Sequence, residues 1–263
     1  MKITIHQDYE QLSIWAANYI AGKINRYSPT KNKPFVLGLP TGSSPVGVYK
    51  NLVKLYSEGK LSFQNVVTFN LDEYVGIPES HPQSFHFFMN EHLFNKVDIQ
   101  RENINILNGN ASDPDAECIE YENKIKSFGG IRLFLGGIGT NGHLAFNEPG
   151  SSLKSKTRIE ALAYDTIVSN ARFFDNDVNK VPRYALTVGI GTIMEAEEIL
   201  IIVCGYKKAG ALQKIIEDGV NHMWPASALQ FHPKVLIVCD EEATRELDAG
   251  TIKYFREIGA NKI

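Results

Sequence analysis

Residues 35–45 read FVLGLPTGSSP, and this stretch decides the fold. It opens with a short apolar run, passes two glycines and a group of hydroxyl side chains, and reaches a proline, after which residues 46–56 have helical spacing. A continuous apolar run that leads through such a turn into a helix is typical of a parallel strand covered on both faces. The stretch therefore predicts a buried strand, a turn with Ser44 as N-cap, and a helix that begins at Pro45.

The same alternation recurs along the chain. Further strands are expected at residues 2–6, 66–71, 131–135, 198–204 and 235–239. Helical spacing is found at residues 9–24 and 207–218 and again near the C-terminus. Strands that alternate with helices predict an α/β domain with a mostly parallel central sheet and helices on both faces.

Composition limits the kinds of protein this chain can be. It has 263 residues, 43% of them hydrophobic, with 27 basic and 30 acidic side chains and a net charge of -3. This balance argues against a nucleic-acid binder or a protein of anionic membranes. No apolar run approaches the roughly 18 residues of a membrane span, and the first residues lack an export signal. Three cysteines, odd in number and set among apolar neighbours, indicate reduced thiols and a cytoplasmic protein.

Domain organisation is expected to be simple. No repeat, low-complexity tract or linker divides the chain, so residues 1–263 are interpreted as one domain. The segment at about 151–183 differs, since it is polar, charged and weakly periodic. Such a segment is typical of a mobile lid over a site.

Ligands of open parallel sheets bind beyond the carboxyl ends of the strands, so the chemistry is expected there. The turn at residues 38–45 can offer backbone N–H groups at a helix N-terminus, which is a natural anion seat. It lacks the lysine of a nucleoside-triphosphate loop, so a small phosphate monoester fits better. The alternative is an ordinary capped turn.

The next strand runs into Asp72 and Glu73. Carboxylates among apolar residues at a strand end can supply a general base with a raised pKa. The alternative for this pair is a solvated corner of the sheet.

A glycine-rich stretch, GGIGTNGH at residues 136–143, follows the strand at 131–135. It contains a formal G-x-G-x-x-G, but Pro149 soon interrupts any helix, so the dinucleotide interpretation is rejected. Its glycines are expected to let the backbone approach a sugar ring. His143 and Glu148 in the same turn form a candidate proton-transfer pair.

Two cations and a histidine group have less certain roles. Arg172 lies in the lid-like segment and Lys208 at the start of a helix, and each could be a solvated surface charge. Three histidines, His81, His86 and His92, are five and six residues apart, which misses the i, i+4 spacing of helical metal ligands. No metal site is therefore predicted.

Several long motifs together resemble the glucosamine-6-phosphate deaminase family. They are LGLPTGSSPVGVY, VVTFNLDEYVGIP, GGIGTNGHLAFNEPGSSL, ARFFDNDVNKVPRYALTVGIGT and VNHMW, spread over essentially the whole chain. The resemblance implies a Rossmann-like three-layer fold and the hydrolytic deamination of glucosamine 6-phosphate to fructose 6-phosphate and ammonia. It implies no cofactor, and a homohexamer as the assembly.

The resemblance also implies roles for individual residues. Asp72 corresponds to the base that removes the C2 proton to form an enolamine and returns a proton at C1. His143, with Glu148 as its partner, corresponds to the group that opens the sugar ring. The phosphate is expected against five residues: Thr41, Gly42, Ser43, Arg172 and Lys208.

This chain departs from the family at one catalytic position. Asn141 stands where the family usually has Asp, so its neutral amide cannot stabilise a His143 imidazolium by charge. Ring opening is therefore expected to be slowed but not abolished, since Glu148 remains.

Some members of the family are activated by N-acetylglucosamine 6-phosphate at a site between subunits. Positions matching that site are present at Ser151, Ser152, Arg158 and Tyr254. The Lys and Thr usual there are Glu160 and Ala161 in this chain. An anion in place of a phosphate-facing cation opposes binding of a dianion, so weak or absent activation is expected.

Two other functions share features with this sequence. A 6-phosphogluconolactonase would share the phosphate seat and a general-base histidine, but lactone hydrolysis needs no carbon base such as Asp72. A non-catalytic sugar-phosphate sensor would lack chemistry altogether. Against it, the sequence shows no helix-turn-helix segment or basic patch.

Overall fold

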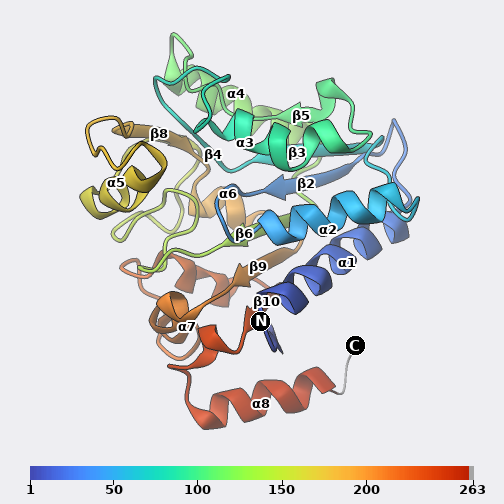
Figure 1. Cartoon of the computed structure of the whole chain (residues 1–263), viewed down its shortest axis with the longest axis vertical. Helices are drawn as coiled ribbons and strands as arrows, with labels where there is room; N and C mark the ends of the chain where they lie inside the picture. Colours follow the sequence, from blue (N-terminus) through green and yellow to red (C-terminus); the bar gives the residue numbers. More distant parts are fainter. Residues whose placement is uncertain (261–263) are drawn as a thin grey trace.

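The structure is a computed structural model that describes residues 1–260. Its centre is a seven-stranded sheet in the order β1-β10-β9-β6-β2-β3-β5, and every neighbouring pair is parallel (Figure 1). The strands are β1 (Lys2–His6), β2 (Phe35–Leu39), β3 (Val66–Asn70), β5 (Ile104–Asn105), β6 (Leu133–Gly137), β9 (Ile199–Val203) and β10 (Val235–Asp240). The predicted α/β class with a mostly parallel sheet is confirmed.

The five inner strands of the sheet, β10, β9, β6, β2 and β3, each contribute side chains to two separate hydrophobic cores. In β9, for example, Leu200 and Ile202 pack in one core, and Ile199, Ile201 and Val203 pack in the other. Successive side chains of a strand point to opposite faces, so a run that is apolar throughout requires cover on both. This is why the apolar runs could be recognised in the sequence.

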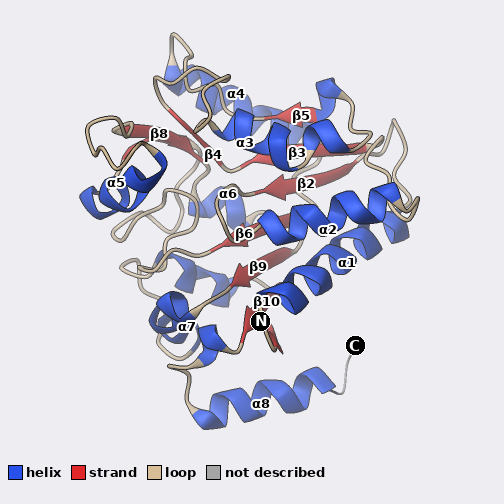
Figure 2. Ribbon diagram, viewed as in Figure 1, coloured by secondary structure: helices blue, strands red, loops and turns tan. Residues whose placement is uncertain are grey.

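Helices cover both faces. Apolar residues of α1 (Tyr9–Tyr27), α2 (Val46–Ser57) and α3 (Phe85–His92) join one core. The other core contains residues of α4 (Pro114–Ser127), α6 (Ile190–Met194) and α7 (Ala209–Ile216), with α8 (Ala249–Ala260) packed against it. The three-layer arrangement is visible in Figure 2. Among the described helices, none combines the length and the apolarity needed to cross a membrane.

One local expectation at the start of α2 is wrong. The helix begins at Val46, Pro45 is the N-cap residue, and no side chain caps it. Ser44 does not cap the helix, because its hydroxyl is a partner of Lys208 instead.

A second, three-stranded antiparallel sheet was not expected. It has the order β4-β8-β7 and consists of β4 (Asp72–Tyr74), β8 (Tyr184–Thr187) and β7 (Arg158–Ala161). These strands have three or four residues of mixed polarity, which give too short a pattern to recognise. The segment at 151–183 thus supplies a strand, and also α5 (Tyr164–Asn170), on the side of the molecule toward which β2, β6 and β9 point (Figure 2).

Candidate active site

The loop between β2 and α2 is held in place by the hydroxyl of Tyr9 in α1. The hydroxyl of Tyr9 accepts a hydrogen bond from the Gly47 amide at 2.8 Å and lies 3.0 Å from the Ser44 carbonyl. Gly42 has φ +93°, in the region that favours glycine, and space is open around it. Within residues 1–260, the Gly42 and Ser43 amides have no hydrogen-bond partner. The loop therefore has free donors and room for an anion.

Lys208 reaches this loop from the segment after β9, which lies two strands away from β2 in the sheet. It follows β9 in the 3-10 helix η4 (Tyr206–Lys208), and its Nζ donates to Ser44 Oγ at 2.9 Å. Burial lowers the pKa of Lys208, an effect opposed by Cys204 and Asp240. Asp240 also fixes the turn before Lys208, because its carboxylate accepts from the Gly205 amide at 3.0 Å. The lysine is thus a positioned part of the site.

Arg172 has a different environment. It lies in η3 (Ala171–Phe173), directly after α5, and is exposed. Its guanidinium is 4.6 Å from the ring centroid of Phe173, its neighbour in the chain. The structure therefore joins Lys208 to the anion seat, but it shows Arg172 on the surface of the lid-like segment.

Asp72 lies in β4 just beyond the end of β3 and is buried, with 7% of its surface exposed. Its Oδ1 has no hydrogen-bond partner among the described residues. Burial, together with a smaller effect of the Glu73 carboxylate, raises the pKa of Asp72 to about 8. Burial raises the pKa of Tyr49 in α2, and the nearby charge of Asp72 raises it further. The Tyr49 hydroxyl donates to the Pro40 carbonyl at the start of the anion seat. A buried carboxyl with a free oxygen beside the seat is suited to accept a proton.

Asn141, His143 and Glu148 come together in the loop after β6. Asn141 Nδ2 donates to Glu148 Oε2 at 2.8 Å, and Asn141 Oδ1 accepts from the His143 amide at 3.3 Å. His143 Nδ1 is 3.5 Å from the same Glu148 oxygen, an ionic contact when the ring is protonated. The expected pair of His143 and Glu148 is thus present, and the amide of Asn141 bonds the carboxylate rather than the imidazole.

Glu148 is held as a carboxylate. Burial alone would raise its pKa, but His143 and hydrogen bonds from Thr166 and Asn141 outweigh burial and lower the pKa of Glu148 to about 2. Thr166 belongs to α5, and its hydroxyl donates to Glu148 Oε1 at 2.5 Å. The lid-like segment therefore contacts the proton-transfer pair directly.

Two glycines of this loop lie where a side chain would meet an aromatic ring of the protein. A Cβ on Gly139 would lie 2.2 Å from Cε1 of His143, so the imidazole occupies the place of a side chain. At Gly142, with φ +75°, a Cβ would meet the Trp224 ring at 2.9 Å. At these two positions the absent side chain leaves room for the His143 and Trp224 rings, and the approach of a sugar to the loop stays a prediction.

Hydrogen bonds connect these groups into one region. Asn147 Nδ2 donates to the Val188 carbonyl at 2.7 Å, and the Val188 amide donates to the Leu71 carbonyl at 2.8 Å. Leu71 directly precedes Asp72, so the loop that carries His143 is tied to the strand that carries Asp72. The carboxyl edge of the sheet thus combines an anion seat, a buried base and an imidazole–carboxylate pair.

Known proteins are similar to the chain over nearly its full length. The sequence model of the family described as glucosamine-6-phosphate isomerases/6-phosphogluconolactonase matches residues 7–237. The chain belongs to this family. A glucosamine-6-phosphate deaminase of Borreliella burgdorferi (strain ZS7) is 63% identical over 98% of this chain and 96% of that protein. One of Phocaeicola vulgatus is 62% identical over 98% of both.

Solved structures agree with this membership. A monomeric glucosamine-6-phosphate deaminase is 42% identical, with a TM-score of 0.89 over 94% of this chain and 100% of that one. A 6-phosphogluconolactonase from Trypanosoma cruzi, at 19% identity, has a TM-score of 0.75 over 94% of this chain and 97% of that one, and shares the fold. The resemblance to the deaminase family and the Rossmann-like fold expected from it are confirmed.

The residues expected from the resemblance at an effector site lie in two places. Arg158 donates to Glu160 Oε1 at 2.6 Å and to Asn147 Oδ1 at 2.9 Å, and its Nη2 is 3.5 Å from Ser151 Oγ. Ser152 and Ala161 lie in the same part of the chain. Tyr254 is in α8, which packs along β1 at the bottom of Figure 1, and 57% of it is exposed.

Two residues near the site were missed from the sequence. Asp240 ends β10, so the rule that chemistry follows strand ends could have found it. Thr166 gave no such signal, since its role depends on a contact with Glu148, 18 positions away. Ser44 was expected in the turn, but its bond to Lys208, 164 positions away, was not.

Three further histidines contact protein groups. His232 is buried and bonds the Ala196 carbonyl at 2.8 Å, and His81 stacks on Phe174. His86 is bonded to Glu73. Within residues 1–260, no group of three His, Cys, Asp or Glu side chains is arranged to hold a metal ion.

Proposed function

We propose that this protein is a glucosamine-6-phosphate deaminase, which converts glucosamine 6-phosphate and water to fructose 6-phosphate and ammonia. The observation that carries the proposal is Asp72, a buried carboxyl with a free oxygen and a raised pKa. A carbon-bound proton needs such a base, whereas hydrolysis of a lactone does not. The curated relatives at 62–63% identity, named for this activity, support the amino-sugar phosphate as substrate.

The substrate phosphate is assigned to the loop between β2 and α2. The amides of Gly42 and Ser43 and the hydroxyl of Thr41 supply donors, and Lys208 supplies a positive charge. Charge-assisted hydrogen bonds are the strongest available to a phosphate. Arg172 completes the seat when the segment at 151–183 acts as a lid and moves toward it.

Ring opening is assigned to His143. The imidazole takes the proton of the anomeric hydroxyl and delivers a proton to the ring oxygen, which breaks the bond between C1 and that oxygen and leaves an aldehyde. Glu148, 3.5 Å from Nδ1, stabilises the imidazolium between the two transfers. Asn141 orients Glu148 for this role through the bond from its amide.

Isomerisation and loss of ammonia follow at Asp72. Its carboxylate takes the C2 proton, and the electron pair of that bond forms a double bond between C1 and C2. The carbonyl pair moves to O1, which takes a proton from water, and the product is an enolamine. Return of the proton to C1 converts C2 to an iminium, which water attacks. Collapse of this adduct breaks the C2–N bond and yields ammonia and the ketone of fructose 6-phosphate.

Three broader features belong to the proposal. The whole chain is taken to work as one domain in the cytoplasm, in accord with its three unpaired cysteines. Self-association to a hexamer is proposed from the resemblance to the deaminase family. Because a solved relative is monomeric, sedimentation is the test, and a single-chain mass at micromolar concentration would overturn the hexamer.

The activity is tested by measuring ammonia and fructose 6-phosphate from glucosamine 6-phosphate, each by its own coupled reaction. Equal yields of the two products are expected, and Asp72→Asn is expected to yield neither. The same preparation is then given 6-phosphogluconolactone. Hydrolysis of the lactone without ammonia from the amino sugar would overturn the proposal.

A further inference from the structure

Two buried polar side chains lie between the loop that carries the proton-transfer pair and the strand that carries the base. Asn147 directly precedes Glu148 in the loop, and Thr187 ends β8. Both side chains are fully buried. In the register of the small sheet, Thr187 is paired with Asp72 of β4. The catalytic steps assigned above use neither Asn147 nor Thr187.

The Thr187 hydroxyl joins the loop to the small sheet. Its Oγ1 accepts a hydrogen bond from the Phe146 amide at 3.1 Å and lies 3.3 Å from the Val188 carbonyl. A hydroxyl can donate one hydrogen bond while it accepts another, so it serves both groups at once. Phe146 lies between His143 and Glu148 in the chain. One hydroxyl therefore ties this loop to the strand that pairs with β4.

The side chain of Asn147 makes a second connection between the same two segments. Its Nδ2 donates to the Leu144 carbonyl at 2.8 Å and to the Val188 carbonyl at 2.7 Å. Its Oδ1 accepts from Arg158 Nη1 at 2.9 Å and from Ser155 Oγ at 3.3 Å. A primary amide has two N–H donors and two acceptor positions, so every one of them is used. Asp lacks the donors and Gln is one methylene longer, so only Asn fits this set of partners.

The backbone between the catalytic histidine and Asn147 is strained. Ala145 has φ +52°, in the left-handed region that residues with a Cβ rarely adopt. Such a conformation persists only where the surrounding structure enforces it. The bond from Phe146 to Thr187 and the bond from Asn147 to Leu144 supply that constraint. Without them the turn is expected to relax, which moves the imidazole that precedes it.

We propose that Asn147 and Thr187 are positioning residues that hold His143 at a fixed distance from Asp72. This inference rests on the proposed function, because the two catalytic groups must act in turn on one bound sugar phosphate. The phosphate is assigned to the loop between β2 and α2, so the sugar cannot follow an imidazole that moves. A displacement of about 1 Å between reacting groups can lower the rate about 100-fold. The two side chains therefore act on the reaction through the catalytic groups and not through the substrate.

The test compares two substitutions of Thr by Val, which has the same shape without a hydroxyl. Thr187→Val removes the acceptor of the Phe146 amide, and kcat with glucosamine 6-phosphate is expected to fall roughly 10- to 100-fold while KM changes little. Thr68→Val is the matched control and is expected to keep kcat. Thr68 is also a fully buried strand residue, but its Oγ1 has no hydrogen-bond partner within residues 1–260. Thr187→Ser retains the hydroxyl and is expected to keep most of kcat.

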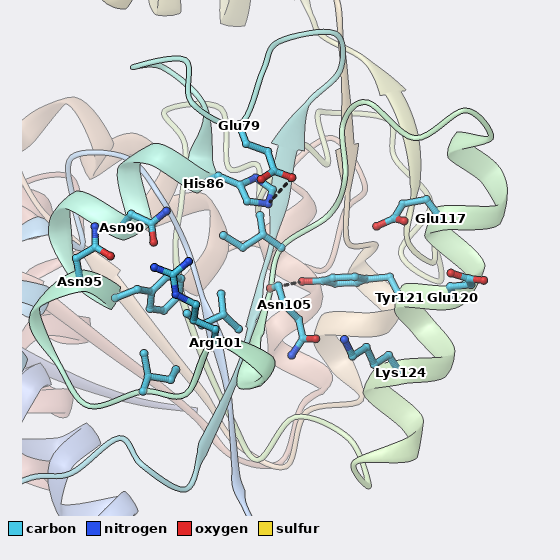
Figure 3. Close-up of a pocket in the computed structure, with 14 residues that line it drawn as sticks. Glu79, His86, Asn90, Asn95, Arg101, Asn105, Glu117, Glu120, Tyr121 and Lys124 are labelled. Carbon is cyan, nitrogen blue, oxygen red and sulfur yellow. Dashed lines mark hydrogen bonds and ion pairs between the residues drawn. The ribbon is translucent and has the colours of Figure 1, made fainter.

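Asn147→Asp is the second variant. It keeps the shape and both acceptor positions, but it replaces the donor of the bonds to Leu144 and Val188 by an oxygen. Asn105→Asp is its control, because Asn105 is also buried and its amide also donates to two backbone carbonyls. Figure 3 shows Asn105 on the edge strand β5, opposite α4 in a groove of about 780 Å³. Both variants are expected to have a lower Tm, but only Asn147→Asp is expected to lose kcat.

A measurement without turnover separates this inference from the proposed function. The nitrogen-15 signals of the His143 ring, assigned with His143→Gln, are expected to move in Thr187→Val and to stay in place in Thr68→Val. If the unmodified protein releases no ammonia, the proposed function has failed, and unmoved ring signals in Thr187→Val would then overturn the inference as well. If it releases ammonia, an unchanged kcat in Thr187→Val and Asn147→Asp, or equal losses in their controls, would overturn the inference alone.

Discussion

The amide of Asn141 donates to Glu148 Oε2 at 2.8 Å, while the His143 ring lies 3.5 Å from the same oxygen. The neutral side chain at position 141 thus holds the carboxylate that the imidazole needs, without adding charge of its own. It explains how a site that lacks the usual Asp can keep its geometry. This hydrogen bond is also what a substitution of Asn141 would alter.

Asn141→Asp is expected to raise turnover. A second carboxylate beside His143 and Glu148 favours the imidazolium that forms during ring opening, and that cation offsets the repulsion between the two acids. The measurement is kcat with glucosamine 6-phosphate. A slower Asp variant would show that the hydrogen bond from Asn141 matters more than the added charge.

The value of kcat/KM is expected to fall as the pH decreases, with the midpoint of the fall near pH 8. Asp72 acts as a base only when ionised, and burial raises its pKa to about 8. The pH profile of kcat/KM checks this. A carbon-13 titration of the Asp72 carboxyl separates the ionisation of Asp72 from that of the substrate amine. A limb near pH 4, where an ordinary aspartate titrates, would contradict it.

Asp72→Asn is expected to stabilise the fold above neutral pH. Between the ordinary pKa of 3.8 and about 8, the unfolded chain loses this proton and the folded chain keeps it, so stability falls as pH rises. Asn has no proton to lose and removes this cost, which amounts to a few kcal/mol at pH 8. Thermal unfolding is expected at a higher Tm in the variant at pH 8, with the difference shrinking toward pH 4. An equal difference at both values would contradict the assignment.

Lys208→Gln is expected to raise KM by roughly 10- to 100-fold, since a charged hydrogen bond contributes about 1.5–3 kcal/mol. Inhibition by inorganic phosphate is expected to weaken in parallel. Lys207→Gln is the matched control, because Lys207 is the adjacent, exposed lysine. Equal effects of the two changes would show that only net charge is involved.

Gly139→Ala is expected to lower kcat strongly. Its Cβ would lie 2.2 Å from the His143 ring, so the imidazole must leave its position next to Glu148. Gly210→Ala, in α7 with open space around it, is the control and is expected to retain activity. Retained turnover in Gly139→Ala would remove His143 from the mechanism.

N-acetylglucosamine 6-phosphate is expected to give little or no activation. Arg158 is already engaged by Glu160 at 2.6 Å, so a phosphate must compete with a carboxylate that is part of the chain. Initial rates against substrate, with and without the N-acetylated sugar, check this. Sigmoidal kinetics that become hyperbolic on its addition would contradict it.

The sequence alone determined six of the seven strands of the central sheet and the edge at which chemistry is proposed. Apolar runs such as residues 35–39 and 199–203 report burial on both faces, and this is a local property of each strand. Parallel strands end at one edge, so polar residues that follow those runs, including Asp72 and His143, could be assigned to one region before their contacts were known.

Only the tertiary structure decided which side chains are partners. Lys208 donates a hydrogen bond to Ser44, which lies 164 residues earlier in the chain. Thr166 of the lid-like segment donates one to Glu148. Glu73, next to the base in sequence, faces the opposite way and bonds His86. Periodicity reports whether a residue is buried, whereas the identity of its neighbour depends on strand order and on how helices pack across the sheet, and no local pattern contains this information.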